Sequence, residues 1–397
     1  MEVDKIKVPL HKAIEIAFDD VNTRLSGETN LSVTYLAGSP GGGKTKSIRA
    51  KCKEEGYKFT WRNMGMIRTE ELGGIPDLLR GRDEFLGRDA LNTEWSIPEL
   101  IVELRDLASP TPEQKKKGEL PFVVVLLDDW HLSPPNVQAL GFELFTDYAI
   151  KRHAIPPNVM FVLAGNDSPA AGARNQFSAI MNRAAKYYVE TDFEYWRDEY
   201  AYKHDVFLPV VSFLESQEYR PLFHGEEQGL DPWPSPRSWT NLSTKLKKLM
   251  ASGIWEDLKE SEKMCVCAAH VGHKAGQEFF TYYNIYMKFN TKQIYDTNKW
   301  KFPKDPMERF AFAFAITHEF YNRHYDGKGK DKKCQHTFGK ILEEVEEHSP
   351  ELAMSSLRYL IAKNEKILVE DLIKSGSIKI DLMKKLFKTS NVLGGKK

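Results

Sequence analysis

The sequence predicts an α/β protein in which a parallel sheet domain precedes a helical region. Three apolar segments, 33–37, 122–127 and 159–164, have the composition of buried strands, and amphipathic stretches separate them. Strands that alternate with helices form a parallel sheet with helices on its faces. Beyond about residue 190 strand signals become rare, and from Trp239 onward nearly every segment has a helical pattern. We therefore expect a parallel βαβ sheet followed by a small helical domain and an all-α extension.

Hydrophobic periodicity and turn residues set the limits of the expected elements. Residues 97–108, for example, place apolar side chains three or four positions apart, as a helix requires, whereas the Pro-rich segment 109–118 reads as a solvated loop. Gly-Gly and Pro within 70–76 mark an inserted loop or hairpin. Further strands are expected at 57–61 and 185–189, and helices at 8–25, 44–56, 134–150, 177–185, 239–252, 260–289, 307–325, 337–348, 351–364 and 366–386.

Composition excludes several classes of protein. The chain has 397 residues, enough for two or three domains, with 56 Lys and Arg against 56 Asp and Glu, so its formal net charge is zero. A protein built to grip nucleic acid usually carries a basic excess. Four cysteines in so long a chain do not indicate a disulfide framework. No apolar run reaches the ~18 residues that span a bilayer. We expect a cytoplasmic protein without a membrane segment.

A glycine-rich loop carries the strongest chemical signal. Residues 38–45 read Gly-Ser-Pro-Gly-Gly-Gly-Lys-Thr, which fills every fixed position of G-x-x-x-x-G-K-[ST] after an apolar strand. Glycines bring backbone N–H groups close to anionic oxygens, and the helix that follows presents its positive end to them. Such loops bind phosphate, with the lysine on the β- and γ-phosphates and the hydroxyl on Mg²⁺. The expected nucleotide-binding residues are Gly38, Ser39, Pro40, Gly41, Gly42, Gly43, Lys44, Thr45 and Lys46.

Polar residues end the two later buried strands. Asp128 and Asp129 follow the run 122–127, and Asn166 follows the run 159–164. Ligands of α/β proteins bind at this edge of the sheet. We expect Asp128 to hold Mg²⁺ together with Thr45, Asp129 to polarise the attacking water, and Asn166 to orient it. His131 is close enough in sequence to approach the site, and we interpret it as structural.

The order of these motifs resembles that of AAA+ ATPases, and within them the MoxR-like and dynein-related branch. The resemblance covers about residues 30–280. Besides the loop, the acid pair and Asn166, the segments that carry it are 71–76, 133–140, 155–158, 181–183 and 234–239.

The resemblance implies a role for each matching residue. Asn166 matches sensor 1. Arg183 matches the arginine finger that reaches the γ-phosphate of a neighbouring subunit, with Arg174 as the second candidate. Arg237 matches sensor 2, the lid arginine. The alternatives are that Arg183 is a cation at a helix end, favoured there by the dipole, and that Arg237 packs beside a nearby tryptophan.

The second acid of the pair is usually Glu in this family, and Asp129 is one methylene shorter, which favours slow hydrolysis because a base displaced by ~1 Å can cost ~10²-fold in rate. The segment 73–95 lies where this branch carries an insertion that usually faces the ring pore. Phe85 and Leu86 at its tip are candidates for gripping a client protein, with local packing as the alternative.

The resemblance implies a hexameric ATPase that uses ATP and Mg²⁺ to remodel or assemble a protein partner, often one with a von Willebrand factor A domain. The expected domains are 1–190 for the nucleotide, 191–290 for the lid and 291–397 for the extension. Because Asp129 stands where the family usually has glutamate, the alternative is a nucleotide-gated scaffold with slow or no hydrolysis. A nucleic-acid motor is disfavoured by the zero net charge.

Overall fold

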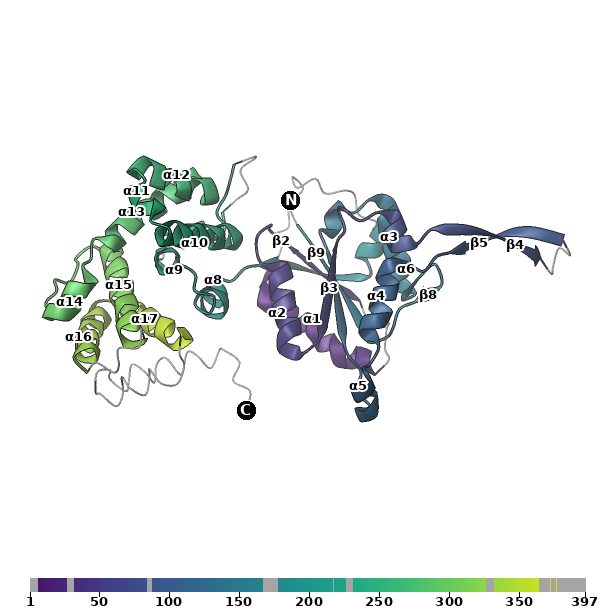
Figure 1. The fold of residues 1–397 in the computed structure, drawn as a ribbon, viewed down its shortest axis with the longest axis horizontal. Coiled ribbons are helices and arrows are strands. Elements are labelled where there is room, and N and C mark those ends of the chain that lie inside the picture. Colours follow the sequence, from purple (N-terminus) through teal and green to yellow (C-terminus); the bar gives the residue numbers. More distant parts are fainter. Residues whose placement is uncertain are drawn as a thin grey trace. The chain divides into compact units, whose positions relative to one another are not determined.

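The chain divides into two compact units. The computed structural model describes residues 6–26, 32–83, 88–166, 178–216, 218–225, 231–325, 332–363, 372 and 376. The first unit is Met1–Asp192 and the second is Phe193–Lys397 (Figure 1). The predicted fold class is confirmed, since a parallel sheet fills the first unit and helices fill the second. The further division of the second unit into a lid and an extension stays a prediction.

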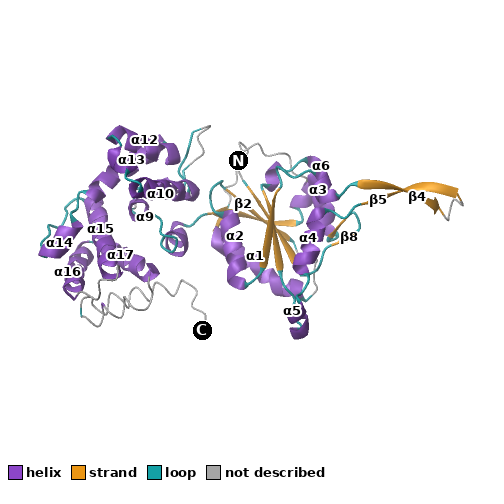
Figure 2. Cartoon of the chain, viewed as in Figure 1, coloured by secondary structure: helices purple, strands orange, loops and turns teal. Residues whose placement is uncertain are grey.

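A six-stranded parallel sheet forms the centre of the first unit (Figure 2). In spatial order its strands are β1 (Lys7–Pro9), β10 (Ala184–Glu190), β2 (Val33–Gly38), β9 (Val159–Gly165), β6 (Val123–Asp128) and β3 (Lys58–Asn63). The five strands expected from sequence are all present. The three-residue strand β1 was not expected, because so short a segment ending in proline carries little pattern.

Helices cover both faces of this sheet, as the continuous apolar strands require. On one face α1 (Leu10–Leu25) and α2 (Lys44–Glu55) pack on strand residues such as Leu36 and Val124. On the other face α3 (Thr69–Gly73), α4 (Glu99–Ala108) and α6 (Pro135–Thr146) pack on alternate residues of the same strands, among them Tyr35 and Val125 (Figure 1). The side-chain period of two thus divides each strand between two cores.

The inserted segment 73–95 forms an antiparallel ribbon of β4 (Pro76–Asp83) and β5 (Arg88–Trp95). It extends away from the sheet beyond α3 and α4 (Figure 2). The sequence-based expectation of a loop or hairpin is therefore confirmed as a hairpin. The tip residues Phe85 and Leu86 lie outside the described residues.

Helices that share one apolar core build the second unit. They include the π-helix η2 (Trp196–Ala201) and the 3-10 turn η3 (Arg220–Phe223). The α-helices are α8 (Phe193–Tyr195), α9 (Leu208–Glu215), α10 (Pro236–Ala251), α11 (Ile254–Asp257), α12 (Glu260–Val271), α13 (His273–Met287), α14 (Thr291–Thr297), α15 (Pro306–Tyr325), α16 (Lys332–His348) and α17 (Pro350–Lys363). The core extends from Phe193 to Leu372, so the segments predicted as lid and extension pack together. Within the described chain, no helix is both long enough and apolar enough to cross a bilayer.

Several predicted elements were wrong in their limits. The helix expected at 260–289 is broken at Gly272, where φ is +84° and an added Cβ would lie 2.5 Å from the Pro232 carbonyl oxygen. The segment 109–118 was predicted to be a loop. Part of it is the short helix α5 (Pro112–Lys117), and Thr111 caps its N-terminus in a capping box. The predicted helix 366–386 lies outside the described residues, apart from Leu372 and Gly376.

Two helices of the first unit are shorter than expected. The helix predicted at 134–150 ends at Thr146, because left-handed residues that include Tyr148 and Lys151 turn the chain into a small hairpin of β7 (Ala149–Ile150) and β8 (His153–Ala154). The helix predicted at 177–185 is the single turn α7 (Ser178–Met181).

The packing of α6 on the turn after β6 generates a prediction. An added Cβ at Gly141 would lie 2.5 Å from the ring of the fully buried Trp130. Glycine to alanine within a helix normally stabilises by about 0.5–1 kcal/mol. Here we expect Gly141→Ala to lower the free energy of unfolding by about 1–3 kcal/mol, through overpacking. Urea unfolding measures it, with the exposed Ala139→Gly on the same helix as a propensity control; a more stable Gly141→Ala would contradict the packing.

Candidate active site

The glycine-rich loop joins β2 to α2 at the carboxyl edge of the sheet. Gly41 and Gly43 have φ values of +78° and +90°, a region that side chains disfavour, so the loop needs glycine there. Gly43 is the N-cap of α2 and supplies no side-chain acceptor to its first turn. The first N–H groups of a helix have no intrahelical acceptor. The loop therefore ends in a helix N-terminus suited to a phosphate.

The ammonium group of Lys44 is held within this loop. Its Nζ donates to the carbonyl oxygens of Gly38, at 2.7 Å, and Ser39, at 3.1 Å. The side chain is buried, with 9% of its surface exposed. These contacts fix one positive charge beside the first turn of α2, where an anion would bind.

Strand β10 supports the loop from the side. An added Cβ at Gly38 would lie 2.4 Å from the carbonyl oxygen of Val189, so β2 and β10 approach as closely as the backbone permits. Beyond β10, the Thr191 hydroxyl donates to the carbonyl oxygen of Gly42 at 2.6 Å. Thr191 was not expected from sequence, because this contact joins residues 149 positions apart.

Thr45 and Asp128 meet as predicted. The Thr45 hydroxyl donates to Asp128 Oδ2 at 2.6 Å, and both side chains are half-buried. Mg²⁺ prefers oxygen ligands and is usually held by one or two carboxylates together with substrate phosphates. A hydroxyl and a carboxylate oxygen in contact beside the loop fit such an ion.

Asp129 has an unusual backbone conformation. Its φ is +53°, in the left-handed region, and its N–H donates to Asp128 Oδ1 at 3.0 Å. Aspartate and asparagine occur in this region more often than other side chains with a Cβ. The Asp129 carboxylate accepts a hydrogen bond of 2.9 Å from Asn63 Nδ2. The left-handed backbone thus favours aspartate over most other side chains at this position.

Asn63 was missed by the sequence analysis. The expected strand ended at residue 61, whereas β3 extends to Asn63, whose register partner on β6 is Asp128. The available signal was a polar residue just after an apolar strand, the same signal that identified Asn166. The register between the two strands, which brings Asn63 to the acid pair, is absent from the sequence.

Asn166 and His131 lie together beside the acid pair. The Asn166 N–H donates to His131 Nδ1 at 3.3 Å. His131 is 1% exposed. Burial lowers the pKa of its imidazole; the Asp129 and Asp128 carboxylates oppose this, and the Lys44 ammonium adds to it. The ring is therefore neutral at physiological pH, with Nδ1 as the acceptor.

The loop, Asp128, Asp129 and Asn166 thus share one edge of the sheet, but Arg183 does not. It precedes Ala184, which pairs with Val33 at the start of β2, whereas Gly38 pairs with Val189 near the end of β10. Six residues of strand separate the two levels by about 20 Å. The Arg183 guanidinium lies over the Phe142 ring, 4.5 Å from its centroid.

The other two predicted arginines lie outside the described part of the first unit. Arg237 is exposed in the first turn of α10, which Ser235 caps, and belongs to the second unit. Arg174 lies outside the described residues.

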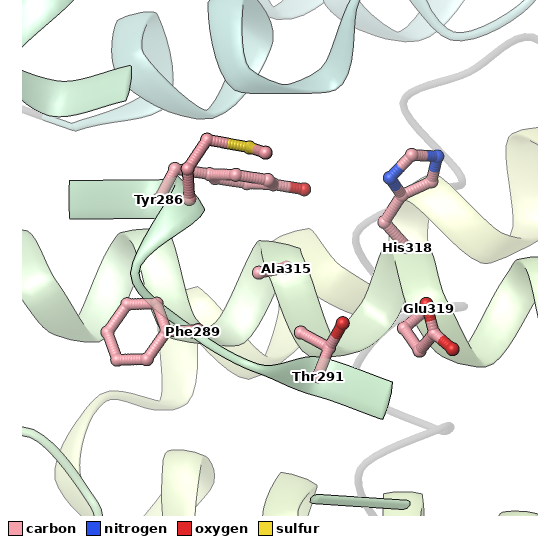
Figure 3. A pocket seen from close by; sticks show the side chains of 7 residues that line it. Tyr286, Phe289, Thr291, Ala315, His318 and Glu319 are labelled. Atoms are coloured by element: carbon pink, nitrogen blue, oxygen red, sulfur yellow. The ribbon is translucent and has the colours of Figure 1, made fainter. Parts of the chain in front are cut away.

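A separate cavity of about 120 Å³ lies in the second unit between α13, α14 and α15 (Figure 3). Polar and apolar residues share its lining, which consists of Tyr286, Met287, Phe289, Thr291, Ala315, His318 and Glu319. Burial lowers the pKa of His318. None of the residues predicted to act on a nucleotide contributes to it.

Comparison with known proteins gives little beyond this geometry. No family model matches the sequence, and no curated protein that was compared matches it. Among solved structures, the chain is similar to the Holliday junction branch migration motor RuvB of Thermotoga maritima, with 12% identity, 96% of this chain and 84% of that chain covered, and a TM-score of 0.29. It is also similar to C. elegans PCH-2, with 14% identity, 68% and 65% covered, and a TM-score of 0.29. Such low TM-scores carry no conclusion, so the fold rests on the sheet and loop described above.

The buried His131 predicts a pH dependence of stability. Because its pKa is lowered in the folded state, the unfolded chain binds the extra proton as pH falls below about 6.5, and stability is lost there. We compare how far the free energy of unfolding decreases when the pH falls from 7.5 to 5.5. We expect this decrease to be about 1 kcal/mol smaller in His131→Gln than in the wild type. Urea unfolding at both pH values measures this, with the exposed His336→Gln as control. Equal losses in His131→Gln and the wild type would contradict the assignment.

Proposed function

We propose that this protein is a Mg²⁺-dependent ATPase of the AAA+ type. The observation that carries the proposal is the 2.6 Å hydrogen bond between Thr45 of the glycine-rich loop and Asp128 of β6. It joins two motifs that lie 83 residues apart. A phosphate loop and an acidic strand end that meet in this way form a site for a nucleoside triphosphate with its metal ion.

The chain's own groups suggest how ATP would be held. The first turn of α2 and the Lys44 ammonium would bind the β- and γ-phosphates. The Thr45 hydroxyl would ligate Mg²⁺, with Asp128 holding a water of its hydration shell. The ion would neutralise charge that develops on the phosphate oxygens.

Asp129 is proposed as the group that polarises the attacking water. Asn63 holds one of its carboxylate oxygens, which leaves the other for the water. Asn166 would orient the same water or contact the γ-phosphate. Because a short carboxylate in a left-handed turn has little reach, we expect hydrolysis to be slow.

Assembly into a ring, most simply a hexamer, would supply the remaining group. Arg183 lies about 20 Å from the loop of its own chain along β10, so it can act only on the nucleotide of another subunit. Arginine fingers contribute ~10³–10⁵ in rate. We propose Arg237 as the lid arginine. We also propose a MoxR-like, chaperone-like role in the cytoplasm, in which the protein acts on a protein client. In the MoxR-like branch such a role often involves a von Willebrand factor A-domain protein.

Substitution of Asp129 tests the reaction. Asparagine tolerates the left-handed conformation as aspartate does, but it cannot accept a proton. We expect Asp129→Asn to lower kcat for ATP by about 10²-fold or more, because general-base catalysis contributes ~10²–10⁴. Affinity for ATP should stay within about threefold, since the phosphate contacts are intact. Steady-state turnover and calorimetric titration measure these quantities.

Lys44→Ala is the control that should abolish ATP binding. Equal, near-background turnover in the wild type and Asp129→Asn would contradict the ATPase proposal and favour a nucleotide-gated scaffold. Turnover that DNA or RNA stimulates would favour a nucleic-acid motor.

Mixing of subunits tests Arg183. If the residue acts on a neighbour, Arg183→Ala chains should depress hydrolysis in wild-type subunits beside them, so activity should fall faster than the wild-type fraction. Lys186→Ala, on strand β10 just after Arg183, is a control that should not do so. A linear decline with the Arg183→Ala fraction would contradict action between subunits.

A further inference from the structure

A buried histidine links the two polar strand ends of the site. His131 belongs to the 3-10 turn η1 (Trp130–Leu132), which begins directly after Asp129. Its Nδ1 accepts the hydrogen bond from the N–H of Asn166, the first residue after β9. One imidazole therefore connects the backbone that carries the proposed base to the residue proposed to orient the water.

Packing leaves the imidazole little freedom. Trp130 is fully buried against Gly141 of α6. The Ser133 hydroxyl donates to the Trp130 carbonyl oxygen at 2.6 Å, which closes the turn. An added Cβ at Gly165 would lie 3.1 Å from His131 Nδ1 and 2.5 Å from the Tyr35 hydroxyl. The ring is thus fixed against the backbone of β9 at its last residue.

The hydrogen bonding also fixes the tautomer. Since Nδ1 is the acceptor, the neutral ring carries its proton on Nε2. Within the described part of the chain, Nε2 is buried and has no hydrogen-bond partner. Leaving a buried donor unpaired costs free energy, so filling space does not account for a histidine here. The imidazole leaves its Nε2 donor without a partner, while Nδ1 accepts a hydrogen bond. This arrangement indicates that the Nδ1 hydrogen bond has a role.

We infer that His131 is a positioning residue, which holds the Asn166 backbone in register with Asp129 and so sets the geometry of the attacking water. The inference rests on the proposed ATPase function. It predicts that loss of the Nδ1 acceptor lowers the rate of hydrolysis and leaves nucleotide affinity unchanged, because the phosphate contacts proposed for the loop and Lys44 do not involve the imidazole.

Two amide substitutions separate the two ring nitrogens. Asn places its carbonyl oxygen near the position of Nδ1, whereas Gln places its amide near Nε2 and leaves Nδ1 without a replacement. We expect His131→Gln to lower kcat about tenfold, the effect of one lost hydrogen bond, with ATP affinity within about twofold. His131→Asn should keep kcat within about threefold of the wild type. A purely structural role would give both variants similar losses and would lower ATP affinity with kcat.

A readout without turnover completes the test. Hydrogen exchange of the Asn166 amide should be faster in His131→Gln than in the wild type and in His131→Asn. Equal exchange in all three proteins, or wild-type kcat in His131→Gln, would overturn the inference. If the wild type hydrolyses ATP no faster than Lys44→Ala, the proposed function fails; the exchange rates then still decide whether His131 holds Asn166.

Discussion

The site depends on one geometric constraint, which is that the carboxyl ends of parallel strands meet at one edge of a sheet. β2, β9 and β6 are neighbours, in that order, and each ends in a residue of the site or leads directly into one. Gly38 begins the phosphate loop, Asn166 follows β9, and Asp128 ends β6. The sheet itself thus brings residues that are distant in sequence close to one another. The hydrogen bond from Thr45 to Asp128 is possible because the sheet has already brought their backbones together.

The sequence predicted those parts of the fold that are encoded locally. A continuous apolar strand followed by a polar residue can be recognised from one segment alone, and so can a glycine loop that matches a fixed pattern. Both identified residues that the structure brings to one edge. The predictions of helix limits that were wrong concern positions where contacts between distant residues or the backbone conformation end the helix. Gly272 breaks a helix where the chain passes the Pro232 carbonyl, and an amphipathic pattern continues across that point.

The sequence alone does not show which residues of different strands contact one another. Asn63 is unremarkable until its strand is placed beside β6, where it donates to Asp129. His131 was interpreted as structural from the sequence. The role of an imidazole depends on its burial and its hydrogen-bond partners, and the local sequence Trp-His-Leu shows neither. The left-handed φ of Asp129 is equally absent from the sequence, although this conformation favours aspartate over most other side chains. The role of Arg183 stays a prediction.

The positions of these groups also bear on how the site is controlled. Asp128, Asp129 and Asn166 lie at one edge of the sheet, and Thr45 in the first turn of α2 contacts Asp128 there. Arg183 lies at the opposite edge of the same sheet, over Phe142. Under the proposed function, a subunit would bind ATP with its own residues and hydrolyse it with help from another. In that proposed arrangement, slow hydrolysis at Asp129 would let bound nucleotide persist until the neighbouring subunit completed the site.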